Sequence, residues 1–295
     1  MKKSLLVVFV LFVSALAVLA QEGPPKVLLI VREEIKPGMM LTHGRHSAEY
    51  AAIFAKLQTP NTRIALVPVA GNENEVVYLN AARSFADIEK INQDTDKKMA
   101  AVNASMQSQI DRLNKEAPDL HSAMRDMLAV YRPEMSFNPG VNISQMRYFV
   151  VTTTRVRPGH DAQYLDYVQK LVNVAREKAK VNLHVAVFQI ISGAPGGTYM
   201  AFRPLKSLSE LDEAVAIKVR AAMSDDQRRD ADKAVGDAVM STESSTYAFA
   251  PRMSFVSEEF AAGDKDFWHP RMETAAKPKP RRRVTKTAPA QPPAN

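Results

Sequence analysis

The sequence contains no cysteine. Disulfides, thiol nucleophiles, CxxC redox motifs, iron–sulfur clusters and cysteine-based zinc sites are therefore all excluded. Stability must come from packing. A chain of 295 residues is long enough for this, because it can bury a large apolar core.

Long apolar runs are missing too, with one exception at the start of the chain. Lys2 and Lys3 precede an unbroken apolar run at residues 5–13, and small residues follow as far as Ala20. This pattern predicts a signal peptide at residues 1–20. The alternative is a membrane anchor, but the run is shorter than the roughly 20 residues that a spanning helix needs. We therefore expect a periplasmic or secreted protein that has no transmembrane segment after cleavage.

The formal net charge of +7 is distributed unevenly. Residues 277–295 carry six basic residues and no acid, and Lys2 and Lys3 add two more charges. These ends leave a net charge of −1 for the rest of the chain. The expected folded part is therefore nearly neutral, so the basic composition does not indicate sequence-specific binding of nucleic acid.

The basic segment at residues 277–295 is rich in proline, lysine and arginine and poor in large apolar residues. This composition predicts a disordered tail, because the segment cannot bury enough surface to fold. Two interpretations stay open. The tail can attract the protein to an anionic envelope surface, such as lipid headgroups, lipopolysaccharide or cell-wall polymer, or it can act as a non-specific solubilising segment.

The chain matches itself at nearly constant offsets. At an offset of 121, residues 35–38 (IKPG) fall on residues 156–159 (VRPG), and at an offset of 118 a PxMSF segment at residues 133–137 recurs at residues 251–255. Such internal similarity predicts a repeated structural unit. We expect one copy at residues 27–138 and a second at residues 147–256.

Each copy shows the same order of patterns: a strand ending in a Pro-Gly turn, an amphipathic helix, a hairpin, a second helix and a closing strand. Capping serines predict where the second helices begin. In the first copy we expect strands at 27–35, 63–69, 76–79 and 133–137, one long second helix from Ser84 to Leu113, and a further helix around Leu120 to Leu128. In the second copy we expect strands at 148–156, 184–191, 198–202 and 251–255, and second-helix segments that begin at Ser207 and Ser224.

The order β-α-β-β-α-β is that of the ferredoxin-like unit. With the Pro-Gly turn in RVRPGHDAQYLDYV and the duplication, the chain resembles the dimeric α+β-barrel superfamily, which includes the antibiotic-biosynthesis monooxygenase, EthD-like and NIPSNAP-like families. The resemblance implies an α+β fold in which the tandem units form an intrachain dimeric α+β barrel. It also implies a ligand cleft between two facing sheets, with helices outside. Members of the superfamily bind haem, oxidise aromatic substrates without a cofactor, or have no assigned reaction, so haem is a cofactor to test.

The candidate ligand-binding residues come from comparing the copies. Arg63 aligns with His184, and Tyr78 with Tyr199, at the offset of 121. If these side chains point into the cleft, they give an apolar pocket one cation, one imidazole and two phenols, which suits a small apolar, aromatic or carboxylate ligand. The alternative is that Arg63 and His184 are solvated strand ends and that the tyrosines fill the core.

A weak metal motif lies in LTHGRHSAEY. His43 and His46 are three residues apart, a spacing that on a helix can bring two imidazoles to one metal ion. The alternative is a solvated helix start, and the second copy has only His160 near the corresponding place.

Three functions follow from these observations. The leading hypothesis is a protein that binds a small apolar or aromatic ligand in the cleft. The second is a monooxygenase-like or haem-dependent enzyme, in which His184 or the pair His43 and His46 supplies the polar group. The third is a structural envelope protein that depends on the basic tail and on Trp268, which lies in a segment expected to dock on the barrel at residues 257–276.

Overall fold

The computed structural model describes residues 23–60 and 62–270. The expected signal peptide and the basic tail at residues 277–295 lie outside this range. Within it, no helix is both long enough and apolar enough to span a membrane.

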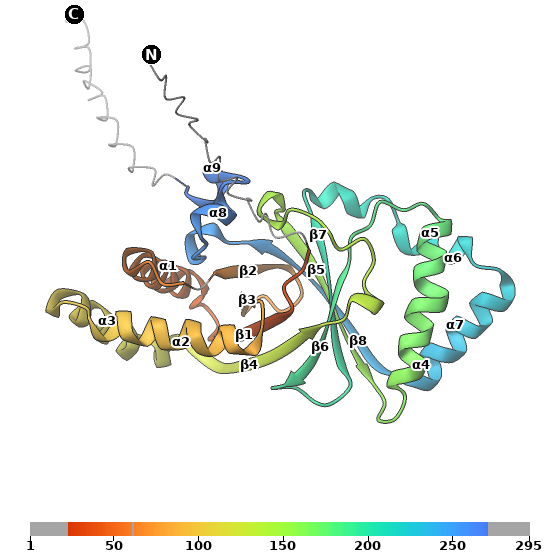
Figure 1. The fold of residues 1–295 in the computed structure, drawn as a ribbon, viewed down its shortest axis with the longest axis horizontal. Helices are drawn as coiled ribbons and strands as arrows, with labels where there is room; N and C mark the ends of the chain where they lie inside the picture. Colours follow the sequence, from red (N-terminus) through yellow and green to blue (C-terminus); the bar gives the residue numbers. More distant parts are fainter. Residues whose placement is uncertain (1–22, 61, 271–295) are drawn as a thin grey trace, which may run out of the picture.

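The two halves of the chain have the same order of elements (Figure 1). The first half consists of β1 (Val27–Ile35), α1 (Met40–Leu57), β2 (Arg63–Ala70), β3 (Glu75–Ala82), α2 (Phe85–Ala100), α3 (Ala104–Leu120) and β4 (His121–Tyr131). The second consists of β5 (Tyr148–Val156), α4 (Asp161–Asp166), η3 (Tyr167–Asn173), α5 (Val174–Lys178), β6 (Ala186–Ser192), β7 (Thr198–Leu205), η4 (Leu208–Leu211), α6 (Val215–Ala222), α7 (Asp225–Ala238) and β8 (Val239–Phe249). Two short helices follow, α8 (Glu258–Ala261) and α9 (Lys265–Trp268).

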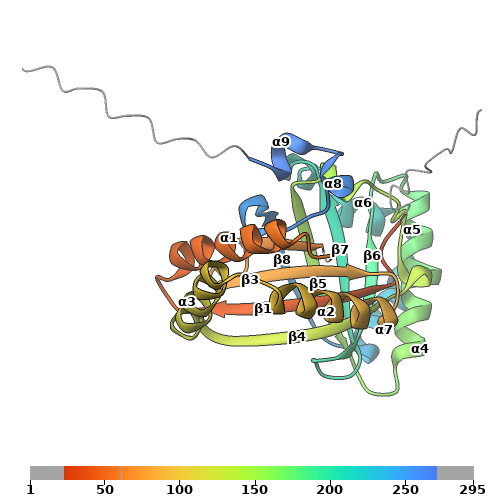
Figure 2. The same ribbon diagram turned by 60° about the vertical axis from the view of Figure 1, so that its left-hand side comes forward.

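The eight strands form one closed antiparallel barrel, in the order β1-β3-β2-β8-β5-β7-β6-β4. Each half supplies four neighbouring strands, and the pairs β2–β8 and β4–β6 join the halves. The helices of the first half and those of the second half cover opposite outer faces of the barrel (Figures 1 and 2). The expected mixed α+β barrel is therefore confirmed.

The final strand of each half lies earlier in the sequence than expected. The segment around Leu120 to Leu128 was expected to be helical, but β4 begins at His121 and pairs with β1 along its whole length. Its residues, HSAMRDMLAVY, have little intrinsic strand preference, so pairing with β1 decides the conformation. The two PxMSF segments are not strands. Both contain a 3₁₀ turn, η1 (Pro133–Met135) and η5 (Pro251–Met253), and only the final Phe forms a single bridge.

The second helix of the first half is also divided. Asn103 separates α3 from α2 as the N-cap of α3, and its side chain accepts a hydrogen bond from the backbone N–H of Met106. Pro118 lies inside α3, which ends two residues later. The expected capping residues are confirmed: Ser84 caps α2, and Ser207 and Ser224 each form a capping box in the second half.

Strand register corrects the alignment of the two halves. Val31 lies opposite Tyr78 in the pair β1–β3, and Thr152, which corresponds to Val31, lies opposite Ala201 in the pair β5–β7. Tyr78 therefore corresponds to Ala201 and not to Tyr199. The reason is that the second half has two more residues than the first between these two strands.

The bridges to the PxMSF segments give the second correction. Arg63 pairs with Phe255, and Val185 pairs with Phe137. Because Phe137 and Phe255 occupy the same place in the two halves, Arg63 corresponds to Val185. The expected partner, His184, is displaced from this position by one residue.

The interior of the barrel is filled by side chains from both halves. Large aromatic residues interdigitate there, with ring centroids of Phe149 at 5.6 Å from Phe202 and 4.9 Å from Phe249. A small space inside the barrel, beside Arg32 and Tyr247, measures about 10 Å³. This holds one water molecule at most. Among the described residues, apolar side chains of both halves thus occupy the barrel interior, where the ligand cleft was expected.

The segment after the second half closes one end of the barrel. Trp268 is buried, and its indole N–H donates a hydrogen bond of 2.7 Å to the carbonyl of Ser144. Its ring packs against Phe249 and Phe260, and α8 and α9 lie together beside this end of the strands (Figure 1). The described part of the segment thus joins the apolar core through Ala261 and Trp268.

Candidate functional site

The four candidate residues taken from the sequence do not line a common cavity. Arg63 and Tyr78 lie together in the first half, where the guanidinium is 3.8 Å from the centre of the phenol ring. Tyr199 packs under the helices of the second half and donates a hydrogen bond of 2.8 Å to Asp161. His184 precedes β6, and its Nδ1 donates to the carbonyl of Asn138. The side chains were expected inside the barrel, but the tyrosines belong to strand faces that point outward, toward the helices.

A cavity of about 520 Å³ lies between the sheet of the second half and its helices. Its walls come from β5, β6, β7 and the helical segments α4 to α7, and valine, alanine and methionine make up most of them. The exposed residues Ala216, Arg220, Asp232 and Val235 mark its outer side. We call this space the second-half cavity.

The second-half cavity exists because small residues replace large ones. In the first half the corresponding space contains Tyr78 and Arg63, whose counterparts in the second half are Ala201 and Val185. Both of these smaller residues line the cavity. The covering helix also departs from regular geometry, because η3 (Tyr167–Asn173) is π-helical and supplies three lining residues. Single π-helical segments occur frequently at functional sites.

Arg176 is the most informative side chain in the second-half cavity. It comes from α5, and its guanidinium donates a hydrogen bond of 2.8 Å to the amide oxygen of Asn173. No carboxylate of the described residues forms an ion pair with it. Burial lowers the pKa of Arg176, and the positive charge of Arg203 lowers it further. The cavity therefore holds a positive charge that no protein anion neutralises.

The other polar groups of the cavity are a second, half-buried cation, Arg203, three phenols, two threonines and, on the outer side, Asp232, which forms an ion pair with Arg220. Arg203 donates to the carbonyl of Glu210 at 3.1 Å, and burial lowers its pKa. Burial raises the pKa of Tyr164 and of Tyr167. The pKa of Tyr199 is raised by burial and by its hydrogen bond to Asp161. The three phenols are therefore protonated at neutral pH, and the cavity offers hydrogen-bond donors on an apolar wall.

The residues of this cavity do not fit haem. Haem iron takes histidine, cysteine, methionine with histidine, or a tyrosine phenolate as its protein ligand. No histidine or cysteine lines the cavity, and the raised pKa of each tyrosine opposes the phenolate form. The residues that line this space therefore provide no axial ligand for the haem that was considered as a cofactor.

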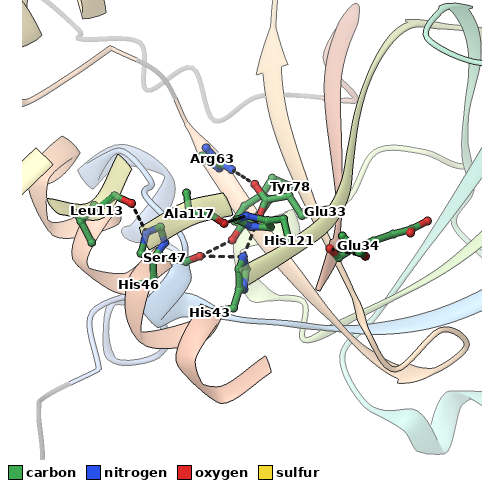
Figure 3. A network of polar contacts seen from close by, with 11 residues as sticks. Glu33, Glu34, His43, His46, Ser47, Arg63, Tyr78, Leu113, Ala117 and His121 are labelled. Atoms are coloured by element: carbon green, nitrogen blue, oxygen red, sulfur yellow. Dashed lines mark hydrogen bonds and ion pairs between the residues drawn. The ribbon is translucent and has the colours of Figure 1, made fainter. Parts of the chain in front are cut away.

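A second group of polar side chains lies in the first half, beneath α1 (Figure 3). Glu33 of β1 is at its centre. Its Oε2 accepts a hydrogen bond from His43 Nε2 at 2.7 Å and lies 3.2 Å from His121 Nε2. Its Oε1 accepts from Arg63 at 3.3 Å. Glu33 and His43 are buried, and the side chain of His121 is only 10% exposed.

The HxxH pair does not act as one unit. His43 points to Glu33, whereas His46 donates a hydrogen bond of 2.9 Å to the carbonyl of Leu113 in α3 (Figure 3). His46 thus joins two helices. The solvated helix start that was the alternative is also wrong, because both imidazoles are buried.

The charge of Glu33 is stabilised by its neighbours. Burial alone would raise its pKa, but the hydrogen bond from His43 and the positive charge of Arg63 lower it more, so the net pKa shift is downward. Ser47 Oγ lies 3.4 Å from His43 Nε2, the same nitrogen that faces Glu33. A serine–histidine–acid relay needs the serine and the acid on opposite nitrogens of the ring. This group is therefore not a catalytic triad.

The sequence contained signals for both sites that the pattern analysis missed. Arg176 follows Val168 and Val172 at helical spacing, so a cation lies on the apolar stripe of its helix. Glu33 alternates with Val31 and Ile35 in β1, so an acid lies on a buried strand face. A charge that interrupts an apolar periodicity would have identified these two residues.

Comparison with known proteins yields similarity of architecture only. No family model matches the chain, and no curated protein matches it. A proposed monooxygenase from Lactobacillus acidophilus is 11% identical, with a TM-score of 0.44 over 78% of this chain and 95% of that one. An anthrone oxidase-like protein is 13% identical, with a TM-score of 0.46 over 78% and 93%. A mutant chlorite dismutase from Candidatus Nitrospira defluvii is 9% identical, with a TM-score of 0.45 over 78% and 92%.

The fold therefore defines the class: an α+β protein with a closed eight-stranded antiparallel barrel, whose solved structural neighbours include monooxygenase-like and chlorite dismutase proteins. At these identities and TM-scores, the activities of the neighbours carry no argument for this chain. Its function has to be argued from its own residues.

Proposed function

We propose that this protein binds a small molecule with an apolar or aromatic body and one anionic group, such as an aryl carboxylate, in the second-half cavity. The observation that carries the proposal is Arg176, a cation without an acidic partner in a space lined mostly by apolar side chains. The volume of about 520 Å³ lies within the roughly 300–1,000 Å³ that is typical of small-molecule sites. The leading hypothesis from the sequence is thus kept, with the ligand moved from the barrel interior to the helix side of one sheet.

The chemistry of the cavity sets the shape of the ligand. A carboxylate gains a charge-assisted hydrogen bond from Arg176, and the planar guanidinium can hold both of its oxygens. Burying the ligand's apolar body against valines and Ala201 removes apolar surface from water. Tyr164 and Tyr199 have hydroxyls that favour a second polar atom on the ligand, since phenols donate and accept hydrogen bonds.

A matched pair of probes tests the proposal. Isothermal titration with 1-naphthoate should show binding, and the neutral 1-naphthylmethanol should bind at least about tenfold more weakly because it lacks the charge that pairs with Arg176. In the variant Ala201→Tyr, which places the Tyr78 side chain of the first half into the corresponding position, both probes should lose binding. Equal affinities for the two probes, or unchanged binding by Ala201→Tyr, would contradict the proposal.

We also propose that the two halves arose by tandem duplication. The shared order of elements supports this, as do the matching registers of β1 with β3 and of β5 with β7. The halves have since diverged, because one fills its helix-facing space with a polar network and the other keeps a cavity. Expressing each half separately and mixing them tests whether the paired strands β2–β8 and β4–β6 are enough to assemble the barrel.

Export and attachment to the cell envelope are proposed from the sequence alone. The support is the apolar segment at residues 1–20 and the basic composition of residues 277–295. Cell fractionation tests export, and the mature chain should start near residue 21. Binding to vesicles that contain anionic lipid should fall as salt increases and should be lost when residues 277–295 are deleted. Equal binding with and without these residues would refute attachment by the tail.

A further inference from the structure

The polar group in the first half has a donor set that suits a metal ion. Glu33 of β1, His43 of α1 and His121 of β4 each offer one ligand atom, and the three atoms lie within 4.8 Å of one another. Glu33 and His43 are 10 positions apart along the chain, and His121 follows His43 by 78 positions. The pairing of β4 with β1 within the first half brings His121 to the other two. Figure 3 shows both imidazoles directed at the carboxylate of Glu33.

The hydrogen bonds around His121 fix its proton. Its Nδ1 lies 2.7 Å from the carbonyl of Ala117, and a carbonyl can only accept, so Nδ1 carries a hydrogen. In the neutral ring, Nε2 then presents a lone pair to the carboxylate of Glu33 at 3.2 Å. Two lone pairs that face one another repel unless a cation lies between them. That cation is either a proton or a metal ion.

His43 approaches the same carboxylate from the other side. Its ring is fully buried, with Nε2 directed at Glu33, and its Nδ1 finds no hydrogen-bond partner among the described residues. A buried polar atom without a partner costs free energy, which is why each case in a folded protein calls for an explanation. The polar contacts of this ring are therefore those of Nε2, which faces Glu33 at 2.7 Å and Ser47 at 3.4 Å.

The surroundings of these three side chains resemble those of histidine and carboxylate ligands in known metal sites. A histidine that binds a metal usually donates its other ring N–H to a carbonyl or a carboxylate, as His121 does to Ala117. Two imidazoles and one carboxylate suit zinc and other first-row divalent metals, whereas magnesium and calcium prefer oxygen ligands only. The hydroxyls of Ser47 and Tyr78, joined by a hydrogen bond of 2.8 Å, lie beside His43. They can orient a water at a fourth coordination position.

We propose that Glu33, His43 and His121 form a binding site for a divalent transition metal, with zinc as the reference ion, that ties β1, α1 and β4 together. Arg63 holds Oε1 of Glu33 and leaves Oε2 to the metal side. The site is independent of the second-half cavity, because it lies under the helices of the other half. Either proposal can therefore fail without the other.

The test uses the full chain after treatment with a chelator. Titration with Zn²⁺ should show a single site, and Zn²⁺ but not Mg²⁺ should raise the melting temperature, because a ligand that binds only the folded state stabilises it. Substitution of Co²⁺ should produce the visible absorption of a nitrogen-coordinated ion. These three measurements need no variant, so they stand even if a substitution prevents folding.

Variants then assign the ligands. Glu33→Gln and His121→Gln should each weaken Zn²⁺ binding by at least about 100-fold. Loss of a residue that only supports a metal ligand weakens metal binding by about 10- to 100-fold, so loss of a ligand should reach at least the upper end of that range. His184→Gln is the matched control. It removes one imidazole from the other half and should leave zinc affinity within about twofold of the wild type. No binding of Zn²⁺ by the wild type, or equal affinities in all three variants, would overturn the proposal.

Discussion

Replacing Arg176 with methionine should stabilise the free protein and weaken ligand binding at the same time. Methionine has nearly the length and the helix propensity of arginine, so the substitution removes the charge and keeps the packing. Replacing a buried ion pair with apolar residues of similar volume is often neutral or stabilising, by about 1–4 kcal/mol, and at Arg176 no acidic partner is left unpaired by the substitution. Arg176 is only partly enclosed, so we expect about 1 kcal/mol, which is about 2–4 °C in melting temperature for a chain of this size.

Ligand binding should change in the opposite direction, because Arg176→Met weakens it. A hydrogen bond to a charged group contributes about 1.5–3 kcal/mol, so the affinity for 1-naphthoate should fall roughly 10- to 150-fold in Arg176→Met. The affinity for the neutral 1-naphthylmethanol should stay within about twofold of the wild type. Differential scanning calorimetry and isothermal titration on the same preparation give both numbers.

Arg228→Met is the control for this pair of measurements. Arg228 lies in the same half on α7, does not line the cavity, and forms an ion pair with Asp225. Exposed ion pairs contribute about 0–1 kcal/mol, so stability and affinity should both change little. The reasoning is refuted if Arg176→Met destabilises the free protein by more than about 1 kcal/mol and leaves the affinity for 1-naphthoate unchanged. That combination would mean that Arg176 is a structural residue.

Three further outcomes are expected. Because the pKa of Glu33 is lowered in the folded state, its ionised carboxylate stabilises the protein at any pH above its ordinary pKa of 4.5. This stability is lost as the pH falls through the lower pKa of the folded state. Urea unfolding between about pH 3 and pH 7 should show this loss in the wild type and a smaller loss in Glu33→Gln. Trp268→Ala should destabilise the protein by about 3–5 kcal/mol, since it empties a closed end of the core, and a change below about 1 kcal/mol in urea unfolding would show that α9 does not dock in solution. Ala201→Tyr should abolish the rise in melting temperature that 1-naphthoate gives the wild type, and a retained rise would place the ligand elsewhere.

Much of the architecture follows from local patterns. The Pro-Gly turns, the alternation in β1 and β5 and the capping serines depend on residues close together in the sequence, and the structure confirms them. The closing strands were missed because β4 and β8 gain their conformation from pairing with distant strands. In HSAMRDMLAVY the pairing with β1 outweighs the local pattern that predicted a helix around Leu120 to Leu128.

The site was harder to predict because it depends on exact register. A displacement of one residue in β2 and of two residues in β3 changes which side chains correspond, so the sequence alignment paired Arg63 with His184 and Tyr78 with Tyr199. The offsets of the PxMSF segments and of the first strands gave no information about the hairpins between them. The cavity itself results from a small residue, Ala201. A small residue cannot be recognised from sequence as the wall of a cavity, because the sequence does not show what that residue faces.

The polar group in the first half shows the same limit. His43 was noted for its spacing from His46, but its actual partners are Glu33, which precedes it by 10 residues, and His121, which lies on β4, the strand paired with β1. Only the paired strands bring them together.

The most direct test of the proposed function is a crystal structure of the protein with 4-bromobenzoate, in which the anomalous signal of bromine locates the ligand. Our account predicts bromine in the second-half cavity, between the sheet strands β5 and β7 and the helix that carries Arg176, with the carboxylate paired to that guanidinium. Bromine inside the barrel, or bound on the surface with the second-half cavity empty of ligand, would contradict it.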